Sequence, residues 1–299
     1  MSEQSNELPE AAERRFAEGA FSSGLSVPDF AACLEMGLQP MGFVQGFCAM
    51  QWSSYAMGGP YRRGLSPYGG TEGGYVQNYQ CPHGMMSAEH RAWGQNYQQP
   101  WIESAWTEGF TSAYVRMLDE ATALGAHGVV GVLDTVGQLS DLGVIEFHIR
   151  GTAIRVHDAP SSSSAPWTTY LAGQRLAKIF EAGYVPISVV AAVASVRVWA
   201  YCMTEYLMER GGTSLWTADS GPVEIEQIVS ARMAAREIVR THARNQLHGD
   251  ALNGVDLLIL EREFAKGDLE IQCVLRGNRL RRFKDFDPLP VPQPTVRLS

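Results

Sequence analysis

The side chains best suited to chemistry in this chain are a cysteine and two histidines that lie close together in the sequence. Cys81 and His83 flank a single proline, and His90 follows seven residues later. Thiolate and imidazole groups are ligands for soft and borderline transition metals. No fourth ligand lies nearby, and the spacing differs from that of common zinc modules. Two interpretations stay open: a soft-metal site, or a solvent-facing loop that carries these residues by chance.

A second pair of candidate metal ligands, Glu146 and His148, lies in a stretch with strand-like alternation. Between residues 145 and 149 apolar and polar side chains alternate, and Arg150 continues the polar series. Successive side chains of a strand point to opposite faces, so these polar residues share one face. Alternation by itself also predicts polar residues on a solvated or inter-subunit sheet face. The pair is therefore a candidate metal site with a structural alternative.

The motifs that common reaction classes require are missing from the sequence. It contains no G-x-S-x-G elbow, no G-x-x-x-x-G-K-[ST] loop and no H-E-x-x-H helix. The glycine-rich residues 125–131 follow a predicted helix and open a strand, the reverse of the order in a phosphate site. Cys48 and Cys202 lie in apolar runs typical of buried structural thiols. We therefore expect a protein that is not an enzyme.

Composition narrows the class of protein and its partners. The 299 residues are 45% hydrophobic, which is enough apolar material for packed cores and argues against a disordered chain. Lys and Arg total 24 against 32 Asp and Glu, a net charge of −8. Sequence-independent nucleic-acid binding needs cationic surface, so we expect no nucleic-acid partner.

The sequence also predicts a soluble cytoplasmic protein with no membrane partner. Residues 1–20 are polar and acidic, unlike a secretory signal. The longest apolar run, residues 185–196, contains two serines and suits a buried strand. The five cysteines are scattered, which is typical of reduced thiols.

Two blocks of sequence recur in the two halves of the chain. Residues 35–44 correspond to 181–190 at an offset of 146, because both read E-x-G-(aromatic or Leu)-x-P before an apolar run. Residues 127–130 correspond to 253–256, and residues 149–151 to 275–277, both at an offset of 126. The chain is therefore interpreted as two diverged copies of one unit, with 20 additional residues in the first.

The additional residues fall in a long insertion rich in Gly, Tyr and Gln. Between about residues 53 and 109 no helical or strand period is visible, and four tryptophans border or occupy the stretch. Long loops of this kind are functional or disordered. The insertion could contact another protein through its aromatic residues, or it could be a lid on its own domain. The predicted division of the chain is a polar arm at 1–24, a first domain at 25–157, a linker at 158–166, a second domain at 167–284 and a Pro-rich tail at 285–299.

Local patterns predict the same element order in both halves. Ser26 and Asp29 form a capping box before a short helix, and Gly37 lies where that helix ends. Apolar spacing then predicts a strand, a longer amphipathic helix and two closing strands that form an antiparallel hairpin. The predicted ranges for the first strand of each half are 41–50 and 187–201. The predicted fold class is α+β, with a helix packed on a small, mainly antiparallel sheet.

Residues 120–132, together with residues 144–155, resemble the YbjQ family, whose pattern runs A-x-x-L-G-A-x-A-V-V-G and then V-x-G-T-A-V. The match is specific over residues 30–157 and weak in the second half, so the chain is interpreted as a diverged tandem repeat. The resemblance implies a dodecin-like βαββ core and a ring, since single-domain relatives are pentamers. The family is described as a heavy-metal-binding domain. That label does not extend to Cys81, His83 and His90, because the insertion is outside the family pattern.

The sequence thus predicts a non-enzymatic protein that assembles with itself. We expect a ring-forming, pentameric scaffold or binding module of two tandem YbjQ-like βαββ domains. The alternative is a soft transition-metal-binding protein that uses Cys81, His83 and His90, or Glu146 and His148. No cofactor besides such a metal is implied.

Overall fold

A computed structural model describes most of the chain. The described residues are 22–51, 79–80, 87–88, 95–139, 144–159, 165–201, 204, 207–208, 224–265 and 268–284.

The first half folds into a helix, a strand, a long helix and a two-stranded hairpin, as predicted. These elements, called the first unit below, are α2 (Val27–Glu35), β1 (Leu38–Gln51), α4 (Pro100–Ala123), β5 (Gly128–Leu139) and β6 (Val144–Val156). Their sheet has the order β1-β6-β5 with antiparallel pairing, and a short parallel strand, β7 (Trp167–Thr168), lies beside β5.

The second half repeats this arrangement. Its elements, called the second unit, are α5 (Gly173–Glu181), β8 (Tyr184–Val198), α7 (Glu226–Asn245), β9 (Ala251–Ala265) and β10 (Asp268–Arg282). Their sheet has the order β8-β10-β9, and β4 (Asn96–Gln98) is added at the outer edge of β8. Two further short strands, β2 (Tyr79–Gln80) and β3 (Ser87–Ala88), pair with each other in an antiparallel manner. The α+β class is confirmed, while the domain boundaries stay a prediction.

The predicted capping signals are present at both ends of α2. The Ser26 hydroxyl accepts a hydrogen bond from the backbone N–H of Asp29 at 3.3 Å and donates to the Asp29 carboxylate at 2.7 Å. After the helix ends, Gly37 adopts a positive φ of 71°. Its counterpart after α5, Gly183, does the same at 79°. These caps fix where each unit turns from its short helix into its first strand.

The structure corrects one part of the repeat alignment. In the first hairpin Gly131 has a φ of 60° and forms a bulge opposite Gly151; in the second, Gly254 has a φ of 64° opposite Gly277. β5 and β9 therefore correspond at an offset of 123, and not the 126 inferred from the sequence, whereas β6 and β10 do correspond at 126. A left-handed backbone favours glycine, so the bulge fixes the register.

The long insertion is shorter than the composition predicts. Residues 96–98 form β4, and α4 begins at Pro100, whereas no periodic structure was expected before residue 110. Proline suits the first turn of a helix, and Ile102 and Trp106 are buried on the inner side of α4. Because polar residues lie between Ile102 and Trp106, the sequence alone does not indicate this apolar side of the helix. Most of the insertion lies outside the described residues.

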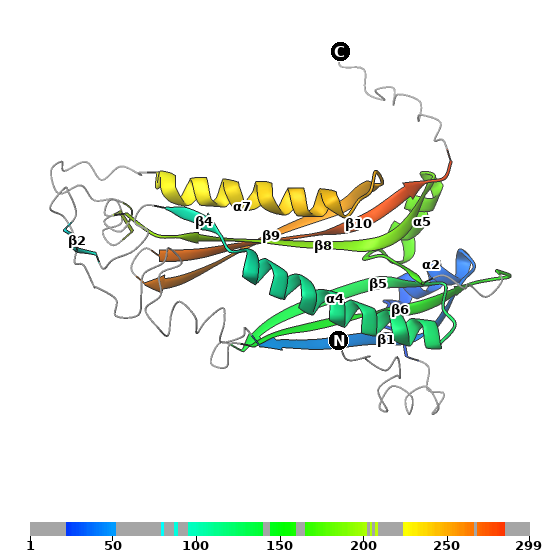
Figure 1. Ribbon diagram of the computed structural model, residues 1–299. Helices are drawn as coiled ribbons and strands as arrows, with labels where there is room; N and C mark the ends of the chain where they lie inside the picture. Colours follow the sequence, from blue (N-terminus) through cyan, green and yellow to red (C-terminus); the bar gives the residue numbers. More distant parts are fainter. Residues whose placement is uncertain are drawn as a thin grey trace, which may run out of the picture.

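The two units are stacked in layers, with the second sheet in the middle (Figure 1). α7 covers one face of that sheet, and α4 lies between its other face and the first sheet. β8 accordingly contributes alternate side chains to two cores: Val190 and Ala192 pack under α7, whereas Val189 and Val193 join the core around α4. The second sheet is thus buried on both faces near β8, and the two units share a core.

The two long helices differ in how they are buried. α7 buries a stripe that includes Ala231, Ala235 and Val239 and exposes residues such as Met233. α4 buries Trp106 and Phe110, whose rings stack with centroids 5.3 Å apart.

Within the described residues, no helix is both long enough and apolar enough to cross a bilayer.

Candidate functional site

The predicted metal ligands fall in two regions with different outcomes. Cys81, His83 and His90 lie outside the described residues, and their assignment stays a prediction. Glu146 and His148 lie in β6 on the face of the first sheet that points away from α4. In the part of the chain that the structure describes, no three His, Cys, Asp or Glu side chains come together as a metal site would require.

His148 is held by its neighbours on the outer face of the first sheet. Its ring stacks on Phe47, which lies opposite on β1, with centroids 4.0 Å apart and planes inclined by 13°. Its Nε2 lies 3.3 Å from Gln45 Oε1. Burial first, and the positive charge of Arg150 second, lower the pKa of His148. The structure therefore favours a neutral imidazole packed against an exposed aromatic ring.

We expect the His148 imidazole to titrate below its ordinary value of about 6.5. The unfolded chain binds the proton more readily, so the contribution of His148 to stability is present above about pH 6.5 and is lost as the pH falls through the lowered pKa. NMR titration of the ring measures the midpoint. Replacing Arg150 by Gln should raise the titration midpoint of His148 in part, because it removes one of the two causes of the lowered pKa. A midpoint at or above 6.5 in the native protein would contradict the burial and charge described for His148.

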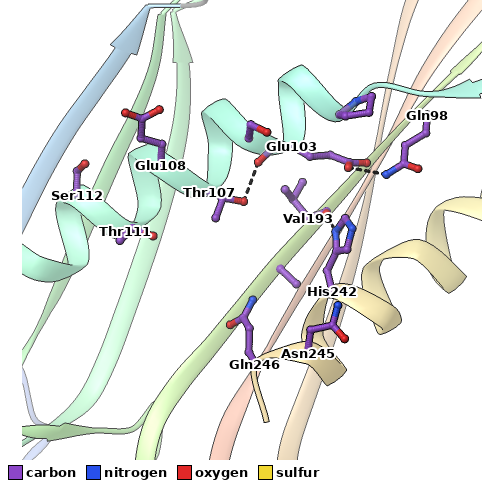
Figure 2. Close-up of a pocket in the computed structure, with 13 residues that line it drawn as sticks. Gln98, Glu103, Thr107, Glu108, Thr111, Ser112, Val193, His242, Asn245 and Gln246 are labelled. Atoms are coloured by element: carbon purple, nitrogen blue, oxygen red, sulfur yellow. Dashed lines mark hydrogen bonds between the residues drawn. The ribbon is translucent and has the colours of Figure 1, made fainter. Parts of the chain in front are cut away.

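A groove of about 720 Å³ separates the two long helices along the outer edge of β8 (Figure 2). One wall is the N-terminal half of α4 and the other is the C-terminal end of α7. Their side chains converge over β8 in the close-up. Representative lining residues are Glu103, Thr107, Thr111, Val193, His242 and Gln246.

The polar groups of this groove mainly satisfy the backbone of β8. Glu103 is buried, and its carboxylate accepts hydrogen bonds from the Ser195 backbone N–H at 2.9 Å and from Gln98 Nε2 at 2.7 Å. His242 Nδ1 lies 2.9 Å from the Val193 carbonyl oxygen, and Gln246 Nε2 donates to the carbonyl of Ala191, also at 2.9 Å. An exposed strand edge needs such cover. These groups therefore cap the edge of β8. No sequence pattern predicts this arrangement, because the residues come from three distant segments.

The contact between the two units, called the joint below, is a second feature that the sequence did not reveal. Residues 167–171, which precede α5, run parallel to the outer edge of β5. Four backbone hydrogen bonds hold them there. The N–H groups of Trp167 and Thr169 donate to the carbonyls of His127 and Val129 at 3.2 and 3.0 Å, and those of Gly131 and Val132 donate to Leu171 and Thr169, both at 3.0 Å.

Apolar and charged contacts extend the joint on both sides. Val130 and Ile154 of the first unit form a buried cluster with Leu176 of α5, against which Phe180 also packs. Farther along the stacked sheets, Arg276 of β10 pairs with Asp134 of β5, with Nη2 and Oδ2 2.6 Å apart. The Asp134 carboxylate is nearly inaccessible to solvent. The units are therefore joined by a strand pair, an apolar cluster and a buried ion pair.

These features define an α+β protein of two stacked units whose clearest specialised surface is the joint. The chain is 24% identical over 259 residues to the Encapsulin nanocompartment protein Rv1762c of Mycobacterium tuberculosis, a match that covers 84% of this chain and 82% of that protein. No family model matches the chain. No solved structure matches it.

Proposed function

We propose that this protein is a non-enzymatic scaffold or binding module that assembles with itself into a ring, built from two YbjQ-like units. The similarity to a protein named for a nanocompartment supports assembly as the function. The proposal does not depend on the groove between α4 and α7, where Glu103, His242 and Gln246 bond to the backbone of β8.

The observation that carries this proposal is the exposed apolar edge strand β9. Val255, Leu258 and Leu260 on this strand are large apolar residues that remain exposed in the single chain. β9 is the last strand of its sheet, and no described segment pairs with its outer side. Soluble proteins protect such edges because they pair readily with other chains. A second protein chain is therefore the expected cover.

Size-exclusion chromatography with light scattering tests the proposal on the untagged full chain. At micromolar concentration we expect a mass that is a multiple of the chain's 32.8 kDa. A pentamer would place ten units in one ring. A mass of one chain at every concentration would overturn the proposal.

A further inference from the structure

Each unit carries the same anchored segment before its short helix. In the second unit, the Thr169 hydroxyl and the next backbone N–H both donate to Asn278 Oδ1 at 2.8 Å. In the first unit, the Ser23 hydroxyl lies 3.3 Å from Thr152 Oγ1, and the next backbone N–H donates to the same oxygen at 3.1 Å. Thr152 and Asn278 are equivalent positions of β6 and β10. Residues 22–25 and 167–171 are therefore held in the same way, each on its own unit.

The outer sides of these two segments differ in what they contact. Residues 167–171 bond to the edge of β5, and Thr168 and Thr169 are buried. In residues 22–25, Ser22 and Gly24 are exposed. No described segment pairs with their outer side. The first unit thus presents one half of a joint without its complement.

The complementary half lies open at the other end of the chain. In the first unit the N–H groups of the bulge residues Gly131 and Val132 donate to residues 167–171. The equivalent bulge residues are Gly254 and Val255, and the β9–β10 register skips both. Val132 is 4% exposed, whereas Val255 is 54% exposed. The edge that residues 167–171 cover in the first unit has no described segment paired with it in the second.

The short helices repeat this difference. Leu176 and Phe180 of α5 pack against the first unit in the apolar cluster of the joint. Both ends of α5 lie 146 residues after the corresponding ends of α2. The residues of α2 that are equivalent to Leu176 and Phe180 are therefore Phe30 and Leu34. Leu34 is 51% exposed, although its counterpart Phe180 is packed. An apolar side chain is thus placed for the same contact with nothing described to cover it.

We propose that a second copy of this chain completes the joint, with residues 22–25 and α2 of one copy seated on residues 251–255 and α5 of the next. This inference rests on the proposed function and names its contact surface. The two faces are different and lie on different units, so the contact is head to tail. Repeated contacts of this kind generate a ring if the rotation closes and a filament if it does not. Backbone pairing along the edge of β9 would set the register between the two copies, and the contact at Leu34 would bury apolar surface between them.

Two single substitutions, one on each face, test the arrangement. Leu34→Lys places a charge on the α2 face, and Val255→Glu places one on the β9 edge. Both positions are half exposed in the single chain, so we expect circular dichroism and melting temperature to stay as in the native protein. We expect each variant to assemble at least tenfold more weakly and to elute as a single chain. Met233→Lys, on the outer face of α7 and 64% exposed, is the matched control and should assemble normally.

An equimolar mixture of the two variants distinguishes head-to-tail contact from a symmetric one. Leu34→Lys keeps an intact β9 edge and Val255→Glu keeps an intact α2 face, so the mixture should form particles of two chains and no larger ones. The inference is overturned if either variant assembles like the native protein, or if the mixture stays as single chains. A native protein that is itself a single chain would instead remove the proposed function on which the inference rests.

Discussion

We expect Gly46→Ala to destabilise the protein more than any other single methyl added to the first sheet. Gly46 lies in the middle of β1 beneath α4. A Cβ atom at this position would lie 1.9 Å from the carbonyl oxygen of Ala113 and 2.7 Å from the Met117 backbone nitrogen. The obstacle is helix backbone, which cannot rotate away as a side chain can, so α4 must move off the sheet. Overpacking costs typically about 1–3 kcal/mol and occasionally more, and we expect the upper end of this range.

The equivalent position in the second unit has a methyl group, and the helix above it leaves space for that group. The residue equivalent to Gly46 in β8 is Ala192, which is buried under α7, so that helix leaves room for a Cβ. Urea unfolding measures the free-energy loss in the first unit. Gly137→Ala is the matched control, because a Cβ there would meet only the Glu146 Cβ at 4.0 Å. Equal stability of Gly46→Ala and Gly137→Ala would show that α4 does not approach β1 this closely.

The second large effect is expected from the buried ion pair between the stacked sheets. Replacing Arg276 by Met leaves the Asp134 carboxylate, whose side chain is only 3% exposed, without its partner. Breaking a buried pair in this way costs about 3–5 kcal/mol, because the remaining charge is desolvated and uncompensated. Tyr170 is part of the same environment, since burial first and the Asp134 charge second raise its pKa. Urea unfolding of Arg276→Met should show the loss.

Two further variants separate the ion pair from a general effect of losing an arginine. The double variant Asp134→Asn with Arg276→Met removes the buried charge as well and should recover much of the lost stability, as a double-mutant cycle measures. Arg281 lies on the same strand, but it is exposed and shares Asp250 with Arg279. Arg281→Met should therefore change stability little. An Arg276→Met variant as stable as Arg281→Met would contradict the buried pair.

The parts of the fold that could be predicted from sequence are those fixed by local chemistry. The capping box at Ser26, the glycine after each short helix and the alternation in β6 each depend on residues close together in the chain. They predicted the order of elements and the α+β class. The buried run in β8 was also predicted, because a strand covered on both faces needs apolar residues in succession.

The features that were predicted wrongly, or not predicted, depend on pairing between residues far apart in the chain. The repeat offset slipped by three residues because Gly128-Val129 and Gly131-Val132 match Gly254-Val255 equally well. Only the bulge in the hairpin, with its positive φ, selects the second pair. The joint could not be predicted for the same reason, because no pattern in residues 167–171 indicates that they pair with the edge of β5. Similarly, the groove beside β8 is assembled from segments on both units.

Electron microscopy of the purified full chain tests the central claim, self-assembly through a repeated joint, most directly. Negative-stain images should show particles in which units follow one another head to tail, as closed rings with an even number of units, two from each chain. Images that show only single chains, or pairs related by a two-fold axis through the β9 edge, would contradict the account.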